Sequence, residues 1–280
     1  MVRILIDSTA DLPEKLKKKA DVIPLTVTFG TEEYVDGVTI THQEFYEKLI
    51  ETSVLPHTSQ ASPQQFADAI RRVQEAGDSA VVITVSAALS GTFQSAQLAA
   101  ADYENIYVVD SQTAAIGAGI LTELALQWAE DGLSAREIAQ RLEKERANVC
   151  VIAMLDTLEY LQKGGRISKT AAIAGNLLGI KPVLSIEHGH IHLLGKARGS
   201  RQANNLLAQE IEKAGGIDFE KPILLGYTGL SDHLLQKYIR DSAAFWQHGA
   251  KELRTTIIGS VIGTHAGPGA VAAAFFKKNG

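Results

Sequence analysis

The sequence predicts an α/β protein with two domains, the first with a mostly parallel sheet flanked by helices and the second with a mixed α/β sheet. Short apolar runs alternate with helical segments through the first half of the 280-residue chain, which is typical of a parallel sheet. Residues 183–194 form two apolar runs around His188-Gly189, which indicates a hairpin and therefore antiparallel strands in the second half. Because the chain is long for one hydrophobic core, we expect domains over residues 1–155 and 156–280.

The expected strands are short apolar stretches that alternate along the chain with helical segments. Residues 80–85 are the clearest strand, because a continuous apolar run is expected where a parallel sheet is covered on both faces. We expect strands at residues 2–6, 22–29, 80–85, 105–109, 149–154, 182–187, 190–194, 222–227 and 255–262. We expect helices at residues 13–19, 42–51, 63–76, 92–101, 113–131, 134–146, 155–162, 168–178, 199–214, 231–244 and 268–277.

Residues 86–95, Ser-Ala-Ala-Leu-Ser-Gly-Thr-Phe-Gln-Ser, place a hydroxyl-rich turn between a buried strand and a helix. Ser90 is well placed to cap that helix at its N-terminus. The turn then offers backbone N–H groups, the positive end of the helix dipole and the hydroxyls of Ser90 and Thr92. Such a turn is where an α/β protein holds an anion.

A second segment with this layout precedes the third expected helix. Ser62 and Gln65 form a capping box, and Pro63 takes the first helical position. Thr58 and Ser59 are therefore expected in the loop just ahead of the helix.

A third such segment lies near the C-terminus. Residues 255–262 predict a strand, which is followed by the glycine-rich residues 263–267 with His265 and then by a short apolar helix. Thr58, Ser90 and His265 could then meet at the carboxyl edge of a sheet, where open α/β folds bind their ligands. The alternative is that each of the three segments is an ordinary cap or turn.

Six short motifs are spread over nearly the whole chain. They are Asp7-Ser8-Thr9-Ala10-Asp11-Leu12, Thr58-Ser59-Gln60, Leu89-Ser90-Gly91-Thr92, residues 158–168 (Leu-Glu-Tyr-Leu-Gln-Lys-Gly-Gly-Arg-Ile-Ser), Ile180-Lys181-Pro182, and residues 263–269 (Gly-Thr-His-Ala-Gly-Pro-Gly). With this order and spacing the chain resembles the DegV family of bacterial fatty-acid-binding proteins, which includes the acyl-carrying subunits of bacterial fatty-acid kinase. The resemblance implies one DegV-type unit over about residues 2–278.

The resemblance implies a lipid-binding protein of fatty acid metabolism or lipid transport. A long-chain fatty acid such as palmitate would lie in a buried tunnel between or beside the domains, and a separate ATP-dependent fatty-acid kinase subunit would convert its carboxylate to an acyl phosphate. The chain would be a carrier and not an enzyme, with no cofactor besides the bound fatty acid. Residues 114–124 and 171–180 are candidates for the tunnel wall, and close packing or a ligand would explain Gly117 and Gly119 within an expected helix.

The residues that match the family's motifs imply a carboxylate site. The fatty-acid carboxylate would be bound by Thr58, Ser59, Ser90, Gly91 and Thr92, with His265 in an orienting or electrostatic role. Neutral hydroxyl and backbone N–H donors would leave the carboxylate oxygen nucleophilic, whereas a bidentate arginine would neutralise it. Arg166 matches a family arginine implicated in docking to the kinase, and the alternative is an exposed arginine in a turn.

A serine acyl hydrolase is a competing hypothesis, with Ser90 as the nucleophile and His265 as the base. Asp7 or Asp110 would be the third member of such a triad. Against it, residues 88–92 lack both glycines of the G-x-S-x-G elbow.

Two further site hypotheses fall on the expected hairpin. His188, His190 and His192 could ligate a metal ion, since residues two apart on a strand share a face, but a half-exposed hairpin shows the same alternation. We therefore expect no metal site. Residues 189–196 superficially suggest a P-loop, but the glycine spacing and the required Ser or Thr are missing, so ATP would have to arrive on a partner.

Composition narrows the class of protein and its location. A net charge of −5 and a pI near 5.9 argue against a nucleic-acid-binding surface. The single cysteine, Cys150, lies in an apolar stretch, which predicts a buried inert thiol and fits a reducing cytoplasm. No apolar run approaches the ~20 residues of a membrane span, and polar Asp7 and Ser8 directly after the first strand argue against a signal peptide.

Overall fold

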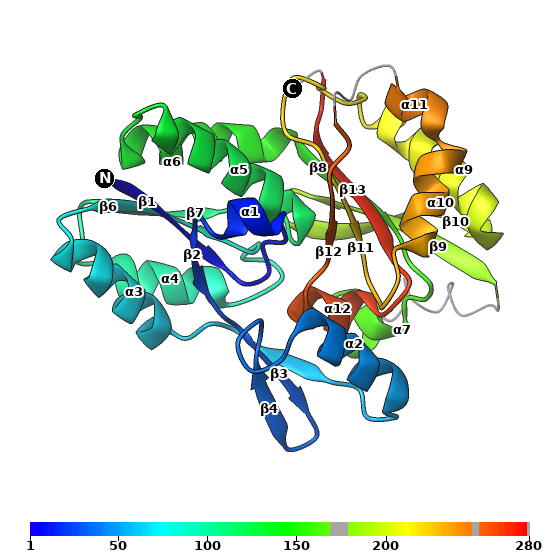
Figure 1. The fold of residues 1–280 in the computed structure, drawn as a ribbon, viewed down its shortest axis with the longest axis horizontal. Helices are drawn as coiled ribbons and strands as arrows, with labels where there is room; N and C mark the ends of the chain where they lie inside the picture. Colours follow the sequence, from blue (N-terminus) through cyan, green and yellow to red (C-terminus); the bar gives the residue numbers. More distant parts are fainter. Residues whose placement is uncertain (169–178, 248–251, 279–280) are drawn as a thin grey trace.

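The structure is a computed structural model that describes residues 1–168, 179–247 and 252–278 (Figure 1). Within these residues the strands form a four-stranded, a six-stranded and a three-stranded sheet. The mixture of a parallel sheet and a mixed sheet, each flanked by helices, confirms the predicted fold class.

The four-stranded sheet is parallel throughout. Its strands, in spatial order, are β2 (Asp21–Ile23), β1 (Val2–Asp7), β6 (Ser79–Thr84) and β7 (Ile106–Asp110). Its two faces are covered by α3 (Pro63–Glu75) with α4 (Thr92–Ala100), and by α5 (Ile116–Glu130) with α6 (Ala135–Glu145). Ala80 and Val82 pack on the α3 side, and Val81 and Ile83 pack on the α5 side. This two-sided burial is what the apolar run at 80–85 predicted.

The six-stranded sheet is mixed. Its strands, in spatial order, are β10 (His190–Arg198), β9 (Ile180–Glu187), β8 (Val149–Met154), β13 (Val271–Phe276), β11 (Leu224–Tyr227) and β12 (Thr255–Ile257). Every neighbouring pair is antiparallel except β11 with β12. The face away from α5 is covered by α9 (Gly199–Lys213) and α10 (His233–Asp241). The hairpin predicted at His188-Gly189 is confirmed, with positive φ at both turn residues.

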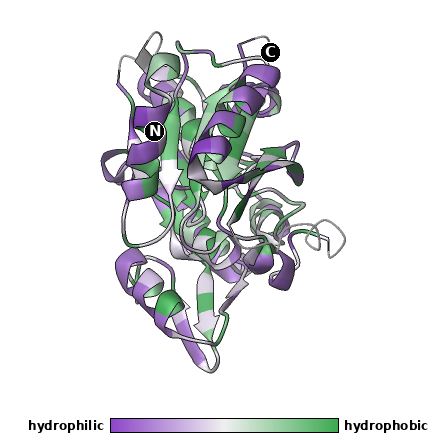
Figure 2. Ribbon diagram, turned by 90° about the vertical axis from the view of Figure 1, so that its right-hand side faces the viewer, coloured by the Kyte–Doolittle hydropathy of each residue, from purple (hydrophilic) through white to green (hydrophobic). Residues whose placement is uncertain are grey.

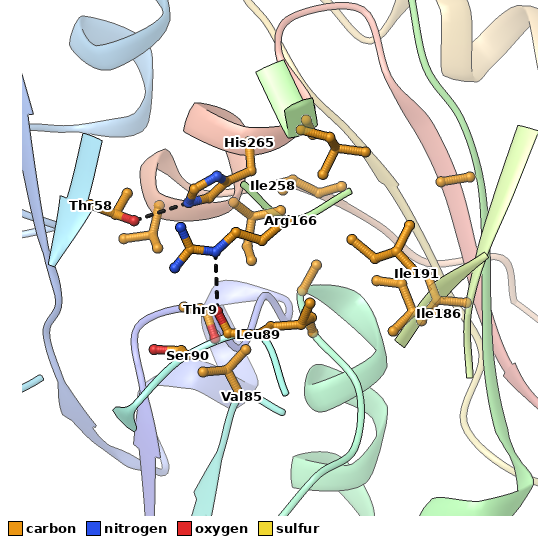
Figure 3. Close-up of a pocket in the computed structure, with 18 of the residues that line it drawn as sticks. Thr9, Thr58, Val85, Leu89, Ser90, Arg166, Ile186, Ile191, Ile258 and His265 are labelled. Carbon is orange, nitrogen blue, oxygen red and sulfur yellow. Dashed lines mark hydrogen bonds between the residues drawn. The ribbon is translucent and has the colours of Figure 1, made fainter. Parts of the chain in front are cut away.

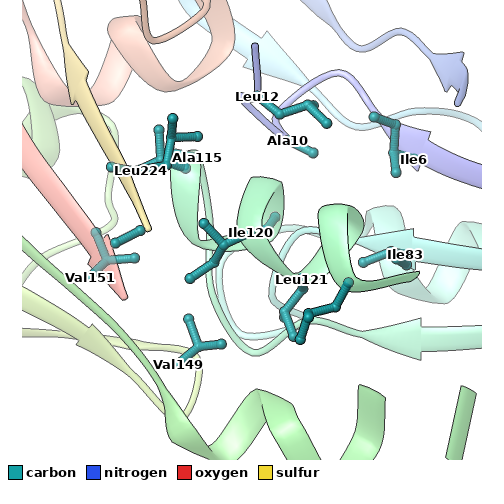
Figure 4. Packing of buried hydrophobic residues seen from close by; sticks show 14 of the residues in the cluster. Ile6, Ala10, Leu12, Ile83, Ala115, Ile120, Leu121, Val149, Val151 and Leu224 are labelled. Atoms are coloured by element: carbon teal, nitrogen blue, oxygen red, sulfur yellow. The ribbon is translucent and has the colours of Figure 1, made fainter. Parts of the chain in front are cut away.

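Helix α5 lies between the two large sheets and is buried along most of its length. Ile120 and Leu121 lie between side chains of the parallel sheet, such as Ile83, and side chains of the mixed sheet, such as Val151 (Figure 4). Hydrophobic residues accordingly gather in the central elements, whereas the outer helices are largely hydrophilic (Figure 2). A helix that is apolar on all sides is expected at such a position.

Gly117 and Gly119 allow this helix to pack closely. A Cβ atom added at Gly117 would lie 2.6 Å from Cγ2 of Val151, and one at Gly119 would lie 2.0 Å from the backbone oxygen of Asp11. Close packing therefore accounts for both glycines.

The three-stranded sheet projects below the other two, beside helix α2 (Figure 1). It is antiparallel, with the order β4 (Glu32–Val35), β3 (Thr26–Phe29) and β5 (His57–Ser59). The remaining elements are α1 (Glu14–Lys17), α2 (His42–Glu51), the 3₁₀ helix η1 (Arg146–Asn148), α7 (Glu159–Lys163), α11 (Ala243–Gln247) and α12 (Ser260–Ala266).

The strand expected at 22–29 is wrong, because it is two strands in different sheets. β2 belongs to the parallel sheet and β3 to the three-stranded sheet, with Pro24 between them. Proline has no N–H to donate to a neighbouring strand. The pairing of β2 therefore ends at Pro24, and the chain continues into the three-stranded sheet.

Two expectations near the C-terminus are also wrong. Of residues 255–262 only the first three form a strand, since Gly259 is the N-cap of α12, which begins at Ser260. Residues 268–277 were expected to be a helix but contain strand β13, whose six residues are all buried. A short apolar run does not distinguish a buried helix from a strand. This run pairs with β8 on one side and β11 on the other, so it forms a strand.

The helix expected at 168–178 lies almost entirely outside the described residues. Strand β8 lies before residue 155, but it pairs with β9 and β13, which lie after it. The division of the chain into two domains at that residue stays a prediction. In the part of the chain that the structure describes, no helix is long and apolar enough to cross a membrane.

Candidate functional site

A cavity of about 420 Å³ lies where the carboxyl end of the parallel sheet meets a face of the mixed sheet (Figure 3). Thr9 and Val85, just after β1 and β6, line it on one side. Val151 of β8 and Ala272 of β13 line it on the other. Most of the lining is aliphatic, so the cavity suits an apolar ligand.

The polar groups of the lining gather at one end of the cavity. Thr58 Oγ1 lies 3.0 Å from Nε2 of His265, and Ser90 faces them across the opening (Figure 3). Thr58 lies in strand β5 and not in a loop, and His265 lies in the last turn of α12 and not in the loop expected from the sequence. Both side chains nevertheless reach the cavity from these elements.

Ser90 does not cap α4 as the sequence suggested. The N-cap residue is Gly91, and the Ser90 hydroxyl accepts the Thr92 N–H at 3.3 Å and lies 2.9 Å from the Thr92 hydroxyl. Serine often bonds locally in this way at a turn. The Ser90 hydroxyl therefore stays at the cavity surface.

The remaining predicted carboxylate ligands divide into two groups. Ser59 and Gly91 line the cavity, whereas Thr92 is fully buried beneath Ser90 and is not part of the lining. A Cβ atom at Gly91 would lie 2.0 Å from the Gln60 side-chain oxygen, so a side chain there would displace the Gln60 amide, which donates to the Ser95 hydroxyl at 2.9 Å.

His265 is the largely buried titratable group of the site. Burial, and secondarily the positive charge of Arg166, lower the pKa of His265 to about 4. Its Nδ1 atom is buried and has no hydrogen-bond partner among the described residues. The imidazole is thus uncharged at neutral pH, which favours an orienting role over an electrostatic one.

Arg166 is exposed at the mouth of the cavity, between His265 and Ser90 (Figure 3). Its Nε donates to the Leu89 backbone oxygen at 3.2 Å, and its Nη1 donates to the Gly164 backbone oxygen at 2.6 Å. The guanidinium is therefore held beside the Ser90 turn.

The sequence reasoning missed several lining residues, including Thr9, Leu25 and Gln60. Thr9 and Gln60 belong to the motifs quoted above, and the position of Thr9 directly after a buried strand was the signal that could have found it. Of the candidate tunnel segments, Ala114 and Ala115 line the cavity, and the second segment lies mostly outside the described residues.

A Ser-His-Asp triad is not assembled among the described residues. His265 contacts Thr58 and not Ser90, and no acid of the described residues bonds to its Nδ1. Asp7 accepts from Thr9 and Val85, and Asp110 accepts from two backbone N–H groups of nearby loops.

No group of three or more His, Cys, Asp or Glu side chains within residues 1–168, 179–247 and 252–278 is arranged to hold a metal ion. His188, His190 and His192 are exposed on the β9–β10 hairpin. The segment that resembled a P-loop is the same hairpin.

Known proteins resemble this chain over nearly its whole length. A DegV domain-containing protein of Clostridium perfringens is 33% identical over 285 residues, covering 97% of this chain and 96% of that protein. A DegV family protein from Thermus thermophilus, described as binding fatty acid, superposes with a TM-score of 0.87 at 32% identity and covers 98% of this chain and 99% of that one. A stearic-acid-binding protein from Eubacterium ventriosum has a TM-score of 0.87 at 29% identity, with 99% of each chain covered.

The family model agrees with these relatives. The model of the DegV family, described as one of uncharacterised proteins, matches residues 1–278. The chain therefore belongs to the DegV family.

Proposed function

We propose that the protein binds one long-chain fatty acid in the cavity, with the acyl chain among the aliphatic side chains and the carboxylate at the end formed by Thr58, Ser90 and His265. The observation that carries this proposal is the shape of the site, an aliphatic cavity with the hydrogen-bonding side chains of Thr58, Ser90 and neutral His265 at one end, where Arg166 is exposed at the mouth. Solved DegV proteins described as fatty-acid-binding support it.

Burial of the acyl chain would provide most of the affinity. Each methylene transferred from water contributes about 0.8 kcal/mol, so roughly fourteen methylenes give an upper bound near 11 kcal/mol before the costs of binding. The head-group contacts need to supply orientation more than affinity.

The carboxylate would receive hydrogen bonds from the Thr58 and Ser90 hydroxyls and from the backbone N–H of Gly91, just before Thr92, with Ser59 beside them. A neutral His265 would orient the Thr58 hydroxyl. These donors are uncharged, and the Arg166 guanidinium already donates to the Leu89 and Gly164 backbone oxygens, so the carboxylate oxygen would stay nucleophilic enough to attack a phosphoryl group.

A separate ATP-dependent kinase would then form the acyl phosphate, so that this chain acts as a carrier and not as the catalyst. Arg166, exposed at the mouth, is the residue that we expect the kinase to contact. Such a partner places the protein in the cytoplasm, which agrees with a single, buried cysteine.

The direct test is denaturing extraction of the purified protein followed by mass spectrometry. A stoichiometric long-chain fatty acid is the expected result, and its identity would show the preferred chain. An extract that remains empty after incubation with fatty acids of 12 to about 20 carbons would reject the proposal.

The head-group assignment is tested by Thr58→Ala and Ser90→Ala. Each removes a donor to the carboxylate and should weaken palmitate binding about ten- to a hundredfold, because a hydrogen bond to a charged group contributes about 1.5–3 kcal/mol. Ser134→Ala, which removes the cap of distant α6, is the control and should bind normally. Unchanged palmitate affinity and unchanged phosphorylation in both site variants would contradict the assignment.

A further inference from the structure

The sequence motif that begins at Asp7 has no role in the function proposed so far. Residues 7–11 follow strand β1 into the interior, and each has a relative exposure of 2% or less. Among these five residues only Thr9 lines the cavity. Two buried aspartates in such a short segment need hydrogen-bond partners, and the partners show what the segment does.

Asp7 holds two parts of the cavity wall. Its Oδ1 accepts the Thr9 N–H at 2.9 Å and the Thr9 hydroxyl at 2.6 Å, and its Oδ2 accepts the Val85 N–H at 2.6 Å. Thr9 and Val85 both line the cavity. Val85 also leads directly into the turn that carries Ser90.

Ser8 and Asp11 of the same segment form hydrogen bonds with two further residues of the cavity wall. The Ser8 hydroxyl accepts the Leu25 N–H at 3.1 Å, and Asp11 donates its backbone N–H to the Ala115 oxygen at 3.2 Å. Leu25 and Ala115 both line the cavity. Ala115 has a φ of 53°, which is unfavourable for a residue with a side chain, so the contact with the segment keeps it in place.

Asp11 holds the start of the helix that carries His265. Its Oδ1 accepts the Gly259 N–H at 2.9 Å, immediately before α12. The Tyr46 hydroxyl donates to the neighbouring Ile258 oxygen at 2.8 Å, so the same turn is held from two sides. The position of this turn sets where α12 begins and hence where His265 meets Thr58.

We propose that residues 7–11 are the hub that positions the ligand site, with Asp7 and Asp11 as positioning residues that fix the Ser90 turn and helix α12 without contacting the ligand. The inference rests on the proposed function, because the site that the hub arranges is the fatty-acid carboxylate site.

The two aspartates differ in a way that makes the hub testable. Asp7 accepts three hydrogen bonds through both oxygens, so an asparagine there would turn an N–H toward another N–H. Asp11 uses one oxygen, so an asparagine can keep the bond to Gly259. Burial raises the pKa of Asp11 to about 8, which makes the neutral asparagine a close substitute at pH 7.

The experiment compares Asp11→Ala, Asp11→Asn and Asp7→Asn by palmitate affinity and by the NMR resonances of the His265 imidazole. Asp11→Ala should weaken binding about tenfold and shift the His265 resonances, since it leaves a buried N–H unpaired. Asp7→Asn should weaken binding by at least as much. Asp11→Asn should preserve the affinity within about twofold and leave the resonances in place.

Leu207→Ala is the matched control, because Leu207 packs in the core beneath the far face of the mixed sheet. It should lower the thermal stability but leave the affinity and the His265 resonances unchanged. If Asp7→Asn does not fold, Ser8→Ala tests the hub through Leu25 and should also weaken binding.

Two results would overturn the hub. One is a folded Asp11→Ala protein with wild-type affinity and unshifted His265 resonances, and the other is equal damage from Asp11→Ala and Asp11→Asn. If the wild-type protein does not bind palmitate, the proposed function fails, and the His265 resonances still decide whether Asp11 positions α12.

Discussion

At the scale of single residues, His265 shows how burial selects one of two possible roles. Its imidazole contacts Thr58 and is largely buried, and burial, followed by the positive charge of nearby Arg166, disfavours protonation. A cationic histidine would form an ion pair with the carboxylate of the proposed fatty acid, whereas a neutral one can orient the Thr58 hydroxyl. The low pKa therefore agrees with the proposed role of the site, in which the carboxylate oxygen stays nucleophilic.

This arrangement predicts a pH-dependent contribution to stability. The pKa of His265 is about 4 in the folded protein and about 6.5 in the unfolded chain, so the stabilisation is complete above pH 6.5 and is lost as the pH falls toward 4. The free energy of unfolding of wild type minus that of His265→Asn should fall by up to about 3 kcal/mol over this window. Urea denaturation at several pH values measures it.

Leu207→Ala is the control for this experiment, because it removes no ionisable group and Leu207 packs in the core on the far face of the mixed sheet. Its difference from wild type should not follow the titration of His265. A constant difference for His265→Asn would show that the imidazole is protonated as easily in the folded protein as in the unfolded one.

At the scale of secondary structure, helix α12 is positioned by close contacts on several sides. Asp11 holds its start, Thr58 contacts its last turn, and Gly263 lets the aromatic residues of α2 approach its backbone. A Cβ atom at Gly263 would lie 2.5 Å from the Tyr46 hydroxyl and 2.8 Å from a Phe45 ring carbon.

Gly263→Ala should therefore displace α12 and with it His265. We expect a loss of about 1–3 kcal/mol in the free energy of unfolding, as for other overpacked sites, and a palmitate affinity reduced at least tenfold. Chemical denaturation and binding titrations measure the two effects. Ala139→Gly in distant α6 is the control, because it should also lower the stability but bind palmitate normally. A normal palmitate affinity in Gly263→Ala would show that the added methyl group does not displace His265.

The β9–β10 hairpin forms the wall of the cavity opposite the polar end, where Ile186 and Ile191 lie (Figure 3). Ile191→Phe should shorten the space for the acyl tail and lower the affinity for an 18-carbon acid more than that for a 12-carbon acid. Competition binding with the two acids measures the ratio. Leu194→Phe is the control, because Leu194 lies on the same strand but packs on the other face of the mixed sheet, and it should leave the ratio of the two affinities unchanged. An unchanged ratio in Ile191→Phe would mean that the acyl tail does not lie against Ile191.

Some helices and strands could be predicted from the sequence, and others could not. The buried run at 80–85 and the capping box at Ser62 depend on local pattern, and both were predicted correctly. Strand β13 and helix α12 were predicted in the wrong form, because a short apolar run fits either state until its neighbours are known. The contact of Thr58 with His265 depends on α12, so its geometry could not follow from sequence alone.

At the scale of the whole molecule, the cavity lies between the same two sheets as helix α5. Both lie between the parallel and the mixed sheet, and the cavity lining comes from both sheets, for example from Val85 and from Val151. A fatty acid in this cavity would contact both sheets at once, in addition to the contacts that α5 makes with each of them.

Binding should therefore stabilise the two sheets together. At a free fatty-acid concentration of a hundred times Kd, a ligand that binds only the folded state adds about 2.7 kcal/mol to the free energy of unfolding. For a chain of 280 residues the gain corresponds to a rise in Tm of roughly 5 °C. Calorimetry of delipidated and palmitate-loaded protein measures it, and hydrogen exchange locates it.

Amide protection should increase in both sheets, in β6 with the following Ser90 turn and in β8 with β9. Ser90→Ala, at the same palmitate concentration, should show a smaller rise in Tm, because its weaker binding lowers the occupancy. Protection that increases in one sheet only would mean that the acyl chain does not lie between the sheets, and the ligand would then have to be sought along a single wall of the cavity.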